Sequence, residues 1–161
     1  MQKFKNYSLK AYLDQLSLKV PVPGGGSAAA LVGSLGAALI SMVTNYSLKK
    51  NKPKSIETKL KKTLVQSEKI RKQLLDIVDR DAQAYLRVVK TRHSAPKIKK
   101  AALRQASQVP METCRLCYAA IQLTPLLVTD GNRYLLSDVK VAVELLEAAF
   151  NCAMVNVEVN Q

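Results

Sequence analysis

The segment from Ser27 to Val43 restricts the possible folds of this chain more than any other feature. Its 17 residues carry no charged side chain and are apolar around nearly the whole helical circumference. Small residues recur at every fourth position of the segment: Ala29, Gly33, Ala37 and Ser41. They share one helical face, along which another helix can approach closely. A membrane-spanning helix needs about 20 apolar residues, so this shorter run favours a buried central helix of a bundle without membrane contact.

Helical periodicity also covers most of the remaining chain, whereas alternating strand patterns are almost absent. The first expected helix follows Ser8, a suitable N-cap, and spaces apolar residues, Tyr12 among them, at helical intervals up to Leu16. The other expected helices cover residues 27–49, residues 55–91, residues 96–124 with a kink at Pro110, and the chain from Ser137 onward.

Two segments interrupt this helical pattern. Residues 21–26 hold two prolines and three consecutive glycines, which predicts a loop, and residues 129–132 have the composition of a turn. The sequence therefore predicts one all-α domain over residues 1–161. We expect an up-and-down bundle of five helices, with a glycine-rich loop in front of the buried central helix.

The formal net charge of +13 is distributed unevenly. Residues 49–72 contain ten Lys or Arg and two acids, and residues 87–104 contain seven basic residues and no acid. A field of this kind attracts anionic partners, of which nucleic acid is the first generic candidate. Only Tyr85 supplies an aromatic ring near these runs, so base stacking is poorly supported and nucleic-acid binding is not expected.

The cysteines point away from disulfide and metal chemistry. Three cysteines cannot build a disulfide framework. Cys114 and Cys117 have CxxC spacing but lie in a helical stretch without a second pair or a histidine, so core packing is favoured over a metal site. The N-terminal residues are amphipathic rather than a continuous apolar run, which argues against a secretory signal. A cytoplasmic location without a bound metal is the expectation.

The segment Pro21–Leu31, with the sequence PVPGGGSAAAL, resembles the glycine-rich opening of the cyclodeaminase/cyclohydrolase family. The family includes the cyclodeaminase half of formiminotransferase-cyclodeaminase and separate bacterial methenyltetrahydrofolate cyclohydrolases. Further matches follow in order along the chain: Asp81 to Tyr85 with the family's Asp-x-x-Ala-aromatic element, Val109-Pro110 with its kinked helix, and Gly131-Asn132, Ser137-Asp138 and residues 141–157 with its last block. The likeness extends from about residue 9 to residue 160.

Two features depart from the family pattern. Tyr134 stands where the family usually has a second asparagine after the Gly-Asn pair. The chain also stops at Gln161, where the resemblance leads us to expect a further helical segment.

The resemblance implies one-carbon chemistry on a tetrahydrofolate derivative, without a metal or a redox cofactor. In the cyclodeaminase reaction, N10 of formiminotetrahydrofolate attacks the formimino carbon and ammonia leaves, which gives 5,10-methenyltetrahydrofolate. In the cyclohydrolase reaction, water adds to the methenyl bridge and the ring opens. Both reactions pass through a tetrahedral carbon between two nitrogens and require proton transfer, and the sequence does not separate them.

The resemblance assigns the proton transfer to Asp81, with Asp138 as its partner or as an anchor for the pterin ring. It implies that the substrate is bound by residues from three parts of the chain: Gly24, Gly25, Gly26, Ser27, Tyr85, Asn132, Ser137 and Asn156. Considered without the family resemblance, the same residues allow purely structural roles. The glycines can serve a tight turn, Asp81 can be an exposed partner of a lysine, and Asp138 can offset a helix dipole.

The basic runs give a polyglutamylated folate as the expected partner, because its glutamate tail is anionic. The small-residue helix face and the family resemblance favour a homodimer. Two alternatives remain open at this point: a helical dimeric binding module without turnover, and a basic protein that binds nucleic acid.

Overall fold

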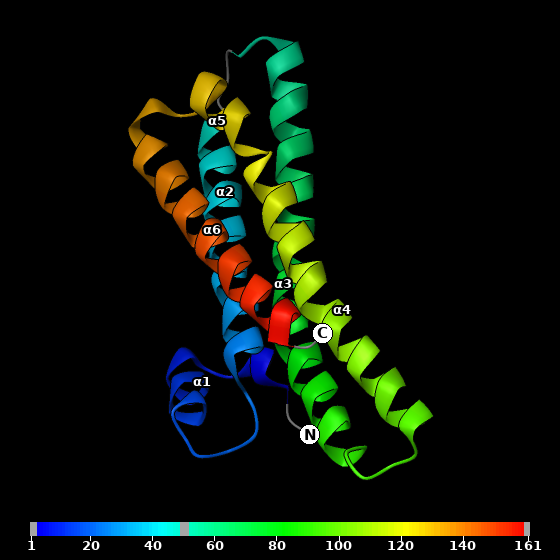
Figure 1. Ribbon diagram of the computed structural model, residues 1–161. Helices are drawn as coiled ribbons and strands as arrows, with labels where there is room; N and C mark the ends of the chain where they lie inside the picture. The colour runs from blue at the N-terminus through cyan, green and yellow to red at the C-terminus, as the bar shows by residue number, and fades with distance from the viewer. Residues whose placement is uncertain (1–2, 49–51, 160–161) are drawn as a thin grey trace.

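Helix α2 (Gly25–Ser47) lies at the centre of the computed structural model, which describes residues 3–48 and 52–159. Three further long helices, α3 (Lys54–Lys90), α4 (Pro96–Ile121) and α6 (Leu136–Val159), run alternately up and down beside it (Figure 1). Short elements lie at the two ends of the bundle: the 3₁₀ turn η1 (Phe4–Asn6), α1 (Leu9–Leu16), α5 (Thr124–Asp130) and the 3₁₀ turn η2 (Arg133–Leu135). The described residues contain no strand, and the prediction of an all-α bundle is confirmed.

The prediction of a buried central helix is also confirmed. Helix α2 packs against α3 and α6 along its length and also touches α4 and α5. Of all the helices in the described ranges, α2 alone is long and apolar enough to span a membrane, and 56% of its most apolar window is buried inside the bundle. Its buried hydroxyl groups have partners, because Thr44 and Ser47 each donate to the carbonyl four residues earlier and Ser41 bonds Ser67 of α3 at 2.8 Å.

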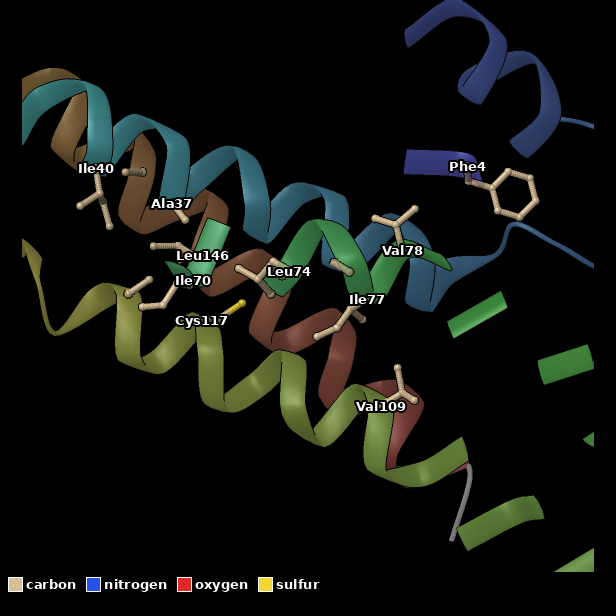
Figure 2. Close-up of a cluster of buried hydrophobic side chains, with 14 of the residues drawn as sticks. Phe4, Ala37, Ile40, Ile70, Leu74, Ile77, Val78, Val109, Cys117 and Leu146 are labelled. Atoms are coloured by element: carbon tan, nitrogen blue, oxygen red, sulfur yellow. The ribbon is translucent and has the colours of Figure 1, made fainter. Parts of the chain in front are cut away.

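One hydrophobic core joins all four long helices and η1 (Figure 2). Ile40 of α2, Leu74 of α3, Cys117 of α4 and Leu146 of α6 are all fully buried in it. Burial raises the pKa of the Cys117 thiol to about 12, so this cysteine is a protonated core residue. Core packing, as predicted for Cys114 and Cys117, is confirmed.

The close contact between α2 and α6 depends on Gly36. A Cβ atom at this position would lie 2.7 Å from Cγ of Leu146 and 3.0 Å from the carbonyl oxygen of Ala142. We expect Gly36→Ala to lower the free energy of unfolding by about 1–3 kcal/mol, the usual range for an overpacked core, as measured by urea denaturation. Gly25→Ala is the control, because no neighbouring atom lies within 4 Å of its added Cβ. Equal stability of the two variants would contradict the close packing of α2 on α6.

Three boundaries differ from the prediction. Helix α2 begins at Gly25 instead of Ser27, so two of the three glycines belong to its first turn. Helix α5 was not expected: Pro125 lies in its first turn, where a proline needs no N–H partner, and Thr129 and Asp130 are helical instead of part of a turn. Helix α4 runs through Pro110 and ends at Ile121 instead of residue 124.

The chain enters the bundle at the end where α2 begins. The backbone N–H of Phe4 in η1 donates to Oδ1 of Asp79 on α3 at 2.6 Å. Ser8 caps α1 as predicted, its side chain accepting from the N–H of Ala11 at 3.1 Å. The segment between α1 and α2 then leads across this end of the bundle to Gly24, which is the N-cap of α2. The first residues of α2 lie next to the C-terminal part of α3, where Gly26 faces Asp81.

Candidate active site

A cavity of about 360 Å³ opens at the end of the bundle where α2 begins. Its wall comes from the segment before α2, from the C-terminal part of α3, from Ala106 of α4 and from the end of α6. Six of the ten residues that the sequence analysis assigned to a site line this cavity: Gly24, Gly25, Gly26, Asp81, Tyr85 and Asn156. Residues far apart in the sequence thus meet at one place.

The carboxyl group of Asp81 occupies the space that a side chain at Gly26 would fill. A Cβ atom built on Gly26 would lie 2.6 Å from the carboxyl carbon of Asp81. None of the glycines in the described residues has a positive φ, so the backbone of Gly26 does not itself require glycine. Position 26 has to lack a side chain for Asp81 to lie against the first turn of α2.

Asp81 is a partly buried carboxyl group with a raised pKa. Burial raises its pKa above the ordinary value, and the backbone N–H of Ser27 opposes this by favouring the carboxylate. The net shift of the pKa is upward, so loss of water contact outweighs the hydrogen bond from Ser27. None of the ion pairs of the described residues includes Asp81, which speaks against the alternative of an exposed partner for a lysine.

Ser27 and Tyr12 form a hydrogen-bonded pair beside the contact between Asp81 and α2. Ser27 is fully buried, and its Oγ lies 3.0 Å from the hydroxyl oxygen of Tyr12 on α1. Burial is the main cause of a raised pKa for Tyr12, and the nearby Asp81 charge also raises it. The sequence analysis identified Tyr12 only as part of an apolar helix face, because no local pattern connects it to Asp81.

The apolar part of the cavity wall was also missed. Ala84 and Val88 follow Asp81 at helical intervals of three and seven residues, and both line the cavity. That spacing on α3 was the available signal. Val22 from the glycine-rich segment and Val159 from α6 complete this apolar surface, but no sequence pattern links either of them to α3.

Three predicted residues lie at the opposite end of the bundle: Asn132, Ser137 and Asp138. The backbone N–H of Asn132 donates to Oγ of Ser47, the last residue of α2, at 2.9 Å. The 22 helical steps from Gly25 to Ser47 correspond to about 33 Å. The structure therefore does not bring Asp138 to Asp81 within one chain.

The local contacts at that end are structural. The side chain of Asn132 accepts a hydrogen bond from the N–H of Tyr134 at 3.2 Å and so caps η2. Asp138 lies in the first turn of α6, where a carboxylate offsets the helix dipole. The position of Asp138 corresponds to the structural alternative that the sequence left open for it. Among the residues 3–48 and 52–159, no group of three His, Cys, Asp or Glu side chains could hold a metal ion.

Comparison with known proteins agrees with this architecture. The model of the formiminotransferase-cyclodeaminase family matches residues 8–161. A methenyltetrahydrofolate cyclohydrolase from Methylorubrum extorquens is 36% identical over 96% of this chain and 79% of its own length. The formimidoyltransferase-cyclodeaminase of Rattus norvegicus is 31% identical over 99% of this chain, which spans 31% of that longer protein.

A solved structure resembles this chain in three dimensions as well. The crystal structure of a formiminotetrahydrofolate cyclodeaminase from Thermotoga maritima superposes with a TM-score of 0.94, at 31% identity over 98% of this chain and 80% of that one. Sequence and fold therefore agree over almost the whole chain, and this chain belongs to the formiminotransferase-cyclodeaminase family.

Proposed function

We propose that this chain is an enzyme that closes or opens the one-carbon bridge between N5 and N10 of tetrahydrofolate. The observation that carries the proposal is Asp81: a partly buried carboxyl group with a raised pKa, held against the first turn of α2 and facing a cavity. A carboxyl group with a pKa shifted toward neutrality can both accept and return a proton. The names of the similar proteins from Methylorubrum extorquens and Thermotoga maritima support this substrate class.

In the cyclodeaminase direction, N10 attacks the formimino carbon and a tetrahedral carbon forms. The formimino group reacts as its cation, with two hydrogens on the terminal nitrogen, and we assign to Asp81 the removal of the N10 proton and its transfer to that nitrogen, which then leaves as ammonia. The bond from the bridge carbon to that nitrogen breaks, and the methenyl bridge remains. One carboxyl group therefore serves both steps, and it regains its starting protonation state.

In the cyclohydrolase direction, water adds to the methenyl carbon while Asp81 takes one of its protons. Asp81 then protonates N5 as the bond between N5 and the bridge carbon breaks. The remaining hydroxyl group loses its proton to solvent, and a formyl group stays on N10. Asp81 can carry out the proton transfers of both reactions from the same position. Its chemistry therefore does not distinguish a cyclodeaminase from a cyclohydrolase.

The rest of the cavity wall fits a substrate with a flat ring and polar edges. Tyr85 and Val88 offer apolar surface on α3, and Asn156 on α6 offers both hydrogen-bond donors and acceptors. The glycines at the start of α2 allow the substrate to approach the backbone closely. Catalysis through Asp81 needs no metal, and we propose none.

We also propose a homodimer. A second, apolar cavity of about 440 Å³ lies on the outer face of α2 and α6 and shares Gly25 and Asn156 with the first. Its remaining lining is made of small or apolar side chains: Ala28, Ala29, Val32, Ala148, Ala149, Cys152 and Val155. Exposed Leu35 and Val141 continue this face along the two helices. A second copy packed there in antiparallel orientation would bring its Asp138 end toward the cavity of the first copy.

Cellular location and substrate form are proposals of the same kind. We propose a cytoplasmic location, because three cysteines without a disulfide framework suit a reducing compartment. A polyglutamylated folate is the proposed natural substrate, because the chain is strongly basic.

The cyclodeaminase and cyclohydrolase activities are distinguished by incubating the purified protein with 5-formiminotetrahydrofolate and with 5,10-methenyltetrahydrofolate in separate assays. We expect the methenyl absorbance to rise with the first substrate or to fall with the second, and ammonia release to accompany only the first. Binding of 5-formyltetrahydrofolate without turnover of either substrate would favour a binding module. Absence of folate binding, together with salt-dependent binding of RNA or DNA, would replace the proposal with a nucleic-acid-binding function.

A further inference from the structure

The two hydroxyl groups of Tyr12 and Ser27 are buried together next to Asp81. Ser27 is fully buried, Tyr12 is 4% exposed, and their oxygen atoms lie 3.0 Å apart. A buried hydroxyl group without a partner destabilises a fold, because it has lost its hydrogen bonds to water. The pair avoids this cost and ties α1 to the first turn of α2.

Tyr12 is the principal attachment of α1 to the bundle. It is the one residue of this helix that is buried. Leu9 and Leu13 lie one turn apart on α1 and are 74% and 62% exposed, and Leu16 packs only against the edge of the core. The helix is therefore held by the ring of Tyr12 and by Leu16, and the hydroxyl group of Tyr12 supplies the contact that depends on direction.

The first turn of α2 takes its cap from another helix. The N–H groups of a first helical turn have no partner inside the helix, and the N-cap residue Gly24 offers no side-chain acceptor. The carboxylate of Asp81 on α3 accepts from the N–H of Ser27 instead. Ser27 thus takes part in two contacts, since its backbone bonds Asp81 and its side chain bonds Tyr12. A change at one contact is transmitted to the other through this single residue.

We propose that Tyr12 is a positioning residue for Asp81, because it fixes the backbone N–H of Ser27 that holds the carboxyl group in place. The inference rests on the proposed function, in which Asp81 transfers protons, and adds to it a residue outside the cavity. Neither Tyr12 nor Ser27 lines that cavity, so both act through Asp81. The ring of a phenylalanine would fill nearly the same volume, so the role belongs to the hydroxyl group of Tyr12.

Tyr12→Phe tests the proposal, because it keeps the ring and removes the hydroxyl group. We expect kcat to fall about fivefold to tenfold, with little change in the dissociation constant of 5-formyltetrahydrofolate. The acid limb of the pH profile of kcat should move to higher pH, because a looser first turn weakens the N–H bond that favours the carboxylate of Asp81. Asp81 and Tyr85 are the titratable residues of the cavity lining, so Asp81 is the carboxyl group that such a shift reports.

A double-mutant cycle with Ser27→Ala separates positioning from a loss of stability. Each single variant leaves one buried hydroxyl group without its partner, whereas the double variant leaves neither. The double variant should therefore melt at a higher temperature than either single variant. Its kcat should stay as low as theirs, because the link between α1 and the N–H of Ser27 is broken in all three.

Tyr7→Phe is the matched control for Tyr12→Phe. It also removes a hydroxyl group from the N-terminal segment, where the ring of Tyr7 packs against Phe4 with 5.4 Å between the ring centroids. We expect its kcat and its pH profile to equal those of wild type. A kcat of Tyr12→Phe equal to that of this control, or an acid limb that stays in place or moves to lower pH, would overturn the inference.

Two further outcomes decide between positioning, folding and the proposed function. Recovery of kcat in the double variant together with its stability would overturn the inference, since the hydroxyl pair would then act on folding alone. An NMR titration of the Asp81 carboxyl carbon measures its pKa without any substrate. If wild-type protein turns over neither folate while Tyr12→Phe still raises this pKa, the proposed function is overturned and the coupling of Tyr12 to Asp81 stands.

Discussion

Asp81→Asn is expected to lower kcat by about 10²–10⁴-fold and to change the dissociation constant of 5-formyltetrahydrofolate only slightly. The amide keeps the shape of the carboxyl group and its place against Gly26 but cannot accept or return a proton. Steady-state kinetics with either folate substrate, together with titration of the analogue, measure the two effects. Asp76→Asn is the matched control, since Asp76 lies on the same helix but pairs with Lys5 at the surface.

Asp81→Asn is also expected to affect the stability of the protein. Burial raises the pKa of Asp81 above its ordinary value, so the folded state binds this proton more strongly than the unfolded state does. The folded protein therefore loses stability as pH rises from the ordinary value through the raised one, and the full cost remains at neutral pH. Asparagine carries no charge, and Asp81→Asn is expected to melt at the same or a higher temperature than wild type at pH 7. A kcat of Asp81→Asn equal to that of wild type would contradict the proton-transfer role assigned to Asp81.

Gly26→Ala is expected to reduce kcat by about 10²-fold through its effect on Asp81. The added Cβ would lie 2.6 Å from the carboxyl carbon, so the carboxyl group must move, and a displacement of about 1 Å is enough for a loss of this size. Kinetics and the pH profile of kcat measure the change. A displaced, better hydrated carboxyl group should shift the acid limb of that profile toward the ordinary pKa of aspartate.

Gly24→Ala and Gly25→Ala are the controls for this prediction. An added Cβ at either position meets no atom within 4 Å, and both positions border the same cavity as Gly26. We expect their kcat values to remain within a few-fold of wild type, with any loss of substrate contact at these two positions appearing in KM. Equal losses in all three variants would mean that the glycines act through contact with the substrate or through the helix start, and not through the position of Asp81.

The sequence predicted the helices well because helix signals are local. Ser8 and the apolar spacing up to Leu16 define α1 within a few residues, and the uncharged run after Ser27 predicts burial. The start of α2 was placed two residues too late because glycines are weak helix formers. Here the requirement at Gly26 comes from a side chain on another helix, and a single sequence does not display that contact.

The site was predicted in part for the same reason. Asp81 and Tyr85 lie four residues apart on one helical face, and both border the cavity. Asn156 reaches the same place because α6 runs back toward the start of α2, and the family resemblance already included it. Asp138 lies at the other end of that same helix. The family resemblance placed Asp138 in the same block as Asn156, but a helix of 24 residues separates its ends by about 36 Å.

Because the bundle is long, its end opposite Asp81 can be labelled without contact with the cavity of the same chain. Tyr134, in the turn before α6, is 90% exposed and lies at the end opposite Asp81. Substitutions this far apart, without shared partners, are expected to contribute independently to stability. A fluorophore at position 134 would thus leave the cavity of its own chain unaltered and, in the proposed antiparallel dimer, would lie toward the cavity of the other copy.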